Sequence, residues 1–131
     1  MSFRGLIFSM IALAIACATL SAHHSTVAYT ENSIVLKNAT ITKVLWSSPH
    51  IILVFDVKDT RGTSVGWSAE TGSPGSVTRV GWNRNSVKPG DKVTMEVYPA
   101  KNGAHVARLK KVVFSDGHEL TDTQNPTSLK K

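Results

Sequence analysis

Short segments in which apolar and polar residues alternate, each closed by a turn signal, constrain the fold of this chain more than any other feature. A period of two residues is typical of strands with one buried face. The segments are separated by turn-forming sequences such as Asp59-Thr60-Arg61-Gly62, Lys88-Pro89-Gly90-Asp91 and Asn102-Gly103. The pattern predicts five strands, over residues 34–46, 51–58, 64–70, 92–98 and 105–114.

A different pattern lies between the third and fourth of these segments. Ser73 is suited to cap a helix, Pro74 to occupy its first position and Gly81 to end it, which predicts a short helix over residues 74–80. Five strands with a helix in this place are the order of an oligonucleotide/oligosaccharide-binding (OB) barrel, a small all-β fold. The long first strand favours that fold, and a small β-sandwich is the alternative. Neither fold specifies a function.

The amino-terminal end has the features of a cleavable secretory signal. Arg4 supplies a positive charge, residues 6–20 form an apolar run, and Ser21-Ala22 provides small residues before His23. The run is shorter than the roughly 20 residues that a membrane-spanning helix needs. We therefore expect residues 1–22 to be removed, leaving no transmembrane anchor and a periplasmic or secreted protein.

The cleavage point has two alternatives, a cut after Ala18 and lipoprotein processing at Cys17. A cut after Ala22 takes 22 of the 131 residues away and leaves 109, enough for one domain. Cys17 is the only cysteine, so the mature domain folds without a disulfide, which favours a bacterial periplasm. The expected organisation is an amino-terminal segment over 23–32, a barrel over 33–118 and a polar tail over 119–131.

The chain is basic, with a formal net charge of +6 at pH 7. A basic surface raises the question of a nucleic-acid partner, but export and the dispersal of the lysines and arginines along the sequence argue against it. We expect instead an unidentified ligand or protein of the cell envelope, such as anionic lipid headgroups or acidic polymers.

Two histidines stand at the expected mature start, in His23-His24-Ser25. An amino-terminal histidine can chelate a metal through its amine and one ring nitrogen, and a further imidazole gives a three-nitrogen site suited to copper. His50, after a proline at a strand entrance, is the predicted third ligand, with His24 as its substitute. The alternative is a solvated histidine pair and a His50 that only bonds to backbone.

Aromatic residues suggest a second kind of site. Trp46 and Trp82 lie at the ends of predicted elements, so with Glu70 they are candidates to line a ligand groove. Trp67 lies on the face of its strand that the alternation predicts to be buried, so it is predicted to be a core residue. His105 and His118 are predicted to be surface residues at turns.

The sequence contains no pattern typical of a catalytic site. Glu70 has no second acid nearby in sequence, and no catalytic triad, phosphate-binding glycine loop or paired cysteines are present. A binding protein is therefore favoured over an enzyme.

The order of these motifs resembles that of a family of small exported bacterial proteins of unassigned function. The residues that carry the resemblance are the signal followed by Ala22-His23-His24-Ser25, then Trp46-Ser47-Ser48-Pro49-His50, Glu70-Thr71-Gly72-Ser73-Pro74, Gly81-Trp82 and Lys88-Pro89-Gly90-Asp91. Ser48 replaces an asparagine of the family pattern. The resemblance implies an exported single domain and no known activity. The amino-terminal histidine is also similar to the copper brace of oxidative polysaccharide-cleaving enzymes and of some copper-binding periplasmic proteins.

Two hypotheses follow from these features. The first is a copper-handling protein with His23, His24 and His50 as ligands. The second is a non-enzymatic module that binds an envelope ligand or protein without a metal.

Overall fold

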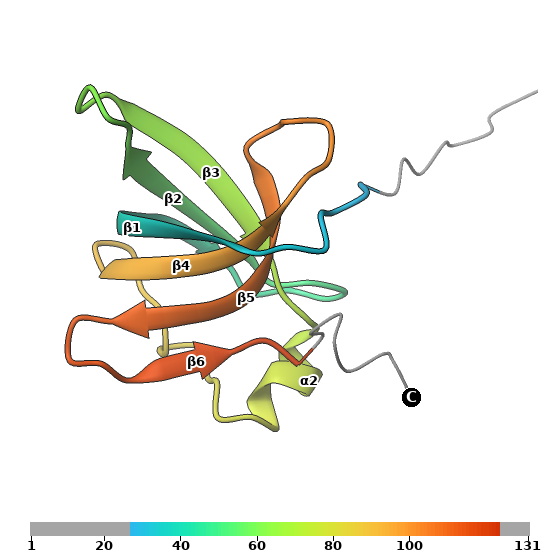
Figure 1. Cartoon of the computed structure of the whole chain (residues 1–131). Helices are drawn as coiled ribbons and strands as arrows, with labels where there is room; N and C mark the ends of the chain where they lie inside the picture. The colour runs from blue at the N-terminus through green and yellow to red at the C-terminus, as the bar shows by residue number, and fades with distance from the viewer. Residues whose placement is uncertain (1–26, 124–131) are drawn as a thin grey trace, which may run out of the picture.

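A computed structural model describes residues 27–123 of the chain (Figure 1). Its elements follow one another as five long strands, a short helix after the third, and a short final strand. Their bounds are β1 Ile34–Leu45, β2 Ile52–Lys58, β3 Ser64–Glu70, α2 Pro74–Thr78, β4 Lys92–Pro99, β5 Val106–Phe114 and β6 Glu119–Thr121. The predicted strands and helix are therefore confirmed, with ends that move by one or two residues.

The five long strands close into a barrel. Hydrogen-bonded neighbours run in the order β3-β2-β1-β4-β5-β6, and β3 also pairs with β5. The β3–β5 pairing is parallel and covers only Ser68–Val106, Ala69–Ala107 and Glu70–Arg108, whereas the other pairings are antiparallel. This topology confirms the predicted OB-like barrel over the sandwich alternative. Within residues 27–123, no helix has the length and apolar character needed to cross a membrane.

Strand β1 serves both halves of the barrel, because it bends in its middle. Its first half pairs with β4 and its second half with β2, and the register with β4 shifts between Leu36 and Ala39. Asn38 lies in that irregular stretch with a φ of 55°, a left-handed conformation that asparagine tolerates better than most residues. The bend allows one strand to continue around the barrel.

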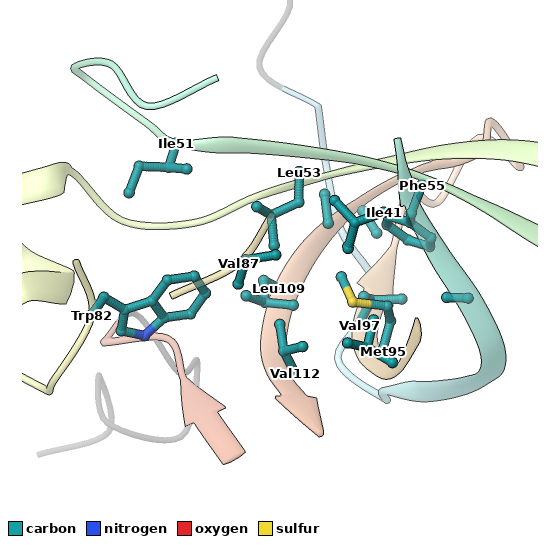
Figure 2. Packing of buried hydrophobic residues seen from close by; sticks show 14 of the residues in the cluster. Ile41, Ile51, Leu53, Phe55, Trp82, Val87, Met95, Val97, Leu109 and Val112 are labelled. Atoms are coloured by element: carbon teal, nitrogen blue, oxygen red, sulfur yellow. The ribbon is translucent and has the colours of Figure 1, made fainter. Parts of the chain in front are cut away.

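The core fills the barrel from end to end. The inward residues of β2 and β5 include Leu53, Phe55 and Leu109, all fully buried, as the period-two pattern of the sequence requires. Figure 2 shows Trp82 and Ile51 at one end of this core and Phe55, Ile41 and Met95 toward the other. The Trp82 end is the one next to α2 (Figures 1 and 2).

Helix α2 begins where the capping residues of the sequence predict. The Ser73 hydroxyl accepts a hydrogen bond from the Ser76 N–H at 3.2 Å, and Pro74 occupies the first turn. The helix is shorter than predicted, and Gly81 follows it with a φ of 100°. The chain can therefore turn sharply at Gly81 and direct Trp82 back toward the barrel.

Strand β6 is the main departure from the sequence prediction. Residues 119–121, assigned above to a polar tail, pair with residues 111–113 of β5. Leu120 packs against the core, and Asp122 is buried. The predicted tail boundary is therefore wrong by at least four residues. A strand of three residues is too short to show an apolar–polar alternation, and the burial of one carboxylate cannot be recognised from the sequence.

Candidate functional site

The parallel pairing of β3 with β5 brings polar side chains to the end of the barrel where β3 finishes. Glu70, the last residue of β3, lies opposite Arg108 of β5 and opposite Ile52 of β2. Arg108 in turn lies opposite Tyr98 of β4. We call the region built by Tyr29, His50, Glu70, Arg108 and Asp122 the seam.

Tyr29 joins the seam from the segment before β1. Backbone hydrogen bonds fix this segment, from Thr30 N–H to the Pro99 carbonyl and from Lys101 N–H to the Ala28 carbonyl, each at 2.9 Å. The Tyr29 hydroxyl donates a hydrogen bond to the Glu70 carboxylate. Partial burial, the negative charge of Glu70 and this hydrogen bond together raise the pKa of Tyr29 to about 12, against a smaller opposing effect of Arg108. The phenol is therefore neutral at physiological pH.

Asp122 anchors the end of the described chain to the seam. Its side chain is fully buried, and its Oδ1 accepts hydrogen bonds from the Gly72 and Thr123 N–H groups, each at 2.9 Å. Its Oδ2 lies 4.0 Å from Arg108 Nε, an ion pair that supplies the opposite charge. A buried carboxylate is tolerated when it is paired and hydrogen-bonded in this way. Asp122 and Arg108 therefore have a structural role here.

His50 enters the seam from the loop before β2. Its Nδ1 lies 2.8 Å from the carbonyl oxygen of Thr71, the residue after Glu70. A carbonyl can only accept, so Nδ1 carries the hydrogen and donates it, and in the neutral ring the lone pair then belongs to Nε2. The Ile51 N–H and the Thr71 N–H bond to the carbonyls of Gly72 and Ile51, which fixes the loop on both sides.

The structure therefore places one predicted metal ligand, His50, and one predicted groove residue, Glu70, at the same end of the barrel. His23 and His24 lie outside the described residues, so their role as ligands stays a prediction. Within residues 27–123, no group of three or more histidine, cysteine, aspartate and glutamate side chains is placed to hold a metal ion.

The predicted groove of Trp46, Trp82 and Glu70 is not formed as such, because Trp82 is a core residue. Its side chain is 2% exposed, and its indole N–H donates to the Thr121 carbonyl at 3.0 Å. The turn at Gly81 directs the indole inward, which a position at the end of an element does not reveal. Trp46 is half-buried and packs against the core.

A groove that the sequence does not indicate lies at the other end of β3. Because β5 pairs with β3 only over Ser68–Glu70, no described strand flanks the first half of β3 on that side. The groove encloses about 580 Å³, and its walls include Val35, Leu36, Val57, Val65, Trp67 and His105. Trp67, predicted as core, is half-buried here, and His105, predicted as an ordinary surface residue, stacks on it at 4.7 Å between ring centroids.

No sequence signal could have identified this groove. Val65 and Trp67 lie on the face of β3 that the sequence predicts to be buried, and they point to the same side as the core residue Phe55. What leaves them accessible is the short length of the β3–β5 pairing, which is a property of the closed barrel. We call this region the Trp67 groove.

Comparison with known protein families gives one match. A family model described as a family of unknown function (DUF6152) matches residues 11–108. The match covers the last part of the apolar run and extends into β5. Comparison with curated proteins and with solved structures finds no significant match.

Proposed function

The chain belongs to this family of unknown function, and from the geometry of the seam we propose that it is an exported protein that binds copper at that end of the barrel. The ligands are the amine and imidazole of His23 at the mature amino terminus and the imidazole of His50, with His24 as the alternative imidazole. The observation that carries the proposal is the fixed orientation of His50.

His50 has the second contact that metal-binding histidines commonly have. A ligand histidine usually donates its remaining ring N–H to a carbonyl or carboxylate, which orients the ring and increases the basicity of the other nitrogen. Here the Thr71 carbonyl accepts from Nδ1 at 2.8 Å. Nε2 is thereby the nitrogen that can bind a metal, and the ring is held before any metal arrives.

The amino-terminal segment approaches the barrel at the same end. Tyr29 contacts Glu70, and Glu70 lies opposite Ile52, two residues after His50. His23 lies four positions before Val27, the first described residue, and an extended chain spans about 13 Å over that separation. The contact of Tyr29 with Glu70 attaches the segment that follows His23 to the seam, and this connection supports the proposal.

Copper is the metal that this donor set favours. Amine and imidazole nitrogens suit Cu(II) better than the hard cations that prefer oxygen, and Cu(II) binds such sites most strongly among the common divalent metals. The Glu70 carboxylate accepts a hydrogen bond from Tyr29, so it is not counted among the proposed copper ligands. The proposed role is binding and handling of copper, and no reaction is assigned to the site.

A Cu(II) titration of the mature protein tests the proposal, read by isothermal calorimetry and electron paramagnetic resonance. An acetyl group on the amino terminus of His23 blocks the chelating amine without moving any other ligand, and we expect the affinity to fall by at least roughly tenfold. His50→Ala should have a similar effect. His118→Ala is the matched control, since His118 is an exposed histidine that stacks on Phe114 and is not one of the seam residues.

Two results would contradict this proposal in different ways. Equal affinity with and without the acetyl group rejects the amino-terminal chelate. Loss of binding in His24→Ala together with unchanged binding in His50→Ala means that the copper is held by a flexible tail, and that the barrel contributes nothing.

The Trp67 groove favours a second function, a binding module for a ligand of the cell envelope that needs no metal. A concave, largely apolar site with a few polar groups is the usual form of a small-molecule site. Trp82, a candidate for this role in the sequence, is buried, so Trp67 takes its place.

A further inference from the structure

We infer that the Trp67 groove binds a single-chain anionic amphiphile, with its alkyl chain along the apolar wall and its anionic head between Lys58 and Lys92. The inference rests on the second proposed function, the binding module, and is independent of copper. It follows from the shape of the groove, the chemistry of its wall and the charges at its edge.

The wall of the groove is mainly aliphatic. Val35, Leu36, Val57 and Val65 contribute branched side chains, and Val35 is 54% exposed although it is a large apolar residue. The volume of about 580 Å³ is within the range of roughly 300–1,000 Å³ found for small-molecule sites. Apolar surface exposed in a concave site gains free energy when an alkyl chain covers it.

The one aromatic pair in the wall favours a chain over a flat ring. His105 already stacks on Trp67, with an angle of 29° between the ring planes. A ligand ring would have to displace His105 before it could use that face of the indole. An alkyl chain needs only the aliphatic wall and the indole edge, so it fits the groove as it stands.

A second cavity, whose lining includes the apolar residues Val93, Val113 and Phe114 as well as polar ones, adjoins the groove at the bend of β1. It encloses about 380 Å³ and shares Asn38 and Lys58 with the groove. Its lining includes a second lysine, Lys92, and the residues Thr40, Thr94 and Ser115. Since Thr40 lies opposite Lys92 across β1 and β4, the lysine and the hydroxyl residue project from the same face.

The charges around the two cavities suit an anion. Lys37 and Lys58 line the groove and Lys92 lines the second cavity, while Asp59 is the one acidic residue in either lining. Within the described residues, these three lysines take part in no ion pair, whereas Lys110 and Lys111 bind Glu96 and Glu119. An anionic head therefore meets unpaired cations beside the apolar wall.

Dodecanoate, used below its micelle concentration, is the probe for this inference. Binding to the full mature protein is measured by calorimetry and by tryptophan fluorescence, with Trp67→Phe to assign the optical signal among the three tryptophans of the chain. We expect saturable binding that acetate and dodecyltrimethylammonium do not reproduce, because the first lacks the chain and the second reverses the charge. Added salt should weaken it.

Paired substitutions locate the two ends of the ligand. Lys58→Gln should weaken binding by roughly twofold to fivefold, and Lys43→Gln, at a lysine of β1 outside both linings, should leave it unchanged. Val35→Ser should weaken binding by roughly fivefold, and Ile34→Ser, an exposed neighbour outside the groove, should not. All four positions are exposed, so the variants are expected to fold.

Three outcomes would overturn the inference. Equal effects of Lys58→Gln and Lys43→Gln mean that only net charge matters. Binding to vesicles of anionic lipid with no binding of monomeric dodecanoate assigns the basic residues to a membrane surface. Binding of naphthalene sulfonate in place of dodecanoate, sensitive to Trp67→Phe, rejects the alkyl chain but leaves the binding-module function standing.

Discussion

Two residues, Tyr29 and Trp82, show how the barrel changes the chemistry of single side chains. Tyr29 is far from Glu70 in sequence, yet its hydroxyl donates to the Glu70 carboxylate and its pKa rises to about 12. Trp82 stands after a helix at a place typical of exposed residues, yet it is 2% exposed and forms one end of the core. In both cases neighbours distant in sequence determine the environment.

Tyr29 gives a prediction about alkaline pH. Its pKa is raised in the folded state, from 10.0 to about 12, so the stability that the Tyr29 contact contributes is complete below pH 10 and is lost as the pH rises toward 12. Absorbance of tyrosinate, followed with near-ultraviolet circular dichroism to confirm folding, should show one tyrosine titrating near pH 12. Glu70→Gln should move that step toward 10, and Tyr29→Phe should remove it. A Tyr29 that titrates near 10 in the folded wild type contradicts the contact.

At the scale of elements, the segment from β6 to Thr123 holds the turn after β3 in place. Asp122 accepts from the Gly72 N–H, the Trp82 indole donates to the Thr121 carbonyl, and Thr123 Oγ1 donates to Ser76 Oγ at 3.3 Å. These contacts join β6 to the turn and to α2. Thr71, in that turn, supplies the carbonyl that orients His50. By fixing the turn, the segment therefore helps to hold the ring of His50 in place.

Gly72 is the position where this arrangement is most sensitive. A Cβ added there would collide with Ser76 Oγ and stand 2.9 Å from Thr123 Oγ1 and 3.4 Å from Asp122 Oδ1. Gly72→Ala should therefore lower the free energy of unfolding by about 1–3 kcal/mol, measured by urea denaturation.

Gly66→Ala is the matched control for that measurement. Its added Cβ would meet only Asp56 Oδ1 at 3.7 Å, an ordinary contact, and alanine costs less than glycine in a strand. We expect unchanged or slightly higher stability in that variant. Equal destabilisation by both substitutions would show that the turn does not depend on close packing at Gly72.

For the whole molecule, the two candidate sites lie in different parts of one small barrel. The seam is at the end where β3 finishes, and the Trp67 groove is beside the first half of β3. The amino-terminal segment reaches the barrel at the seam. The position of the expected signal cleavage therefore bears on the copper proposal and not on the groove, whose lining begins at Val35.

We expect the mature protein to begin at His23. Small residues at Ser21 and Ala22 follow an apolar run too short to span a membrane, which is the pattern that signal peptidase cuts. Mass spectrometry of the amino-terminal peptide from exported protein measures the cut directly. Ala22→Leu should move it to Ala18, and that protein should lose tight Cu(II) binding but keep dodecanoate binding. A mature chain that begins at Thr19 or at lipidated Cys17 in the wild type would remove the amine from His23 and reject the chelate.

The sequence by itself determined the strands, the helix cap and the OB-like order, because these depend on residue periodicity and on local turn chemistry such as that of Ser73 and Pro74. His50 and Glu70, which the sequence offers only as candidate site residues, lie at one end of the barrel in the structure. The closure of β3 on β5 decided the rest. It buried Trp82, left Trp67 beside an open groove and paired Glu70 with Tyr29, since these contacts join residues that are distant in sequence and leave no periodic pattern along the chain.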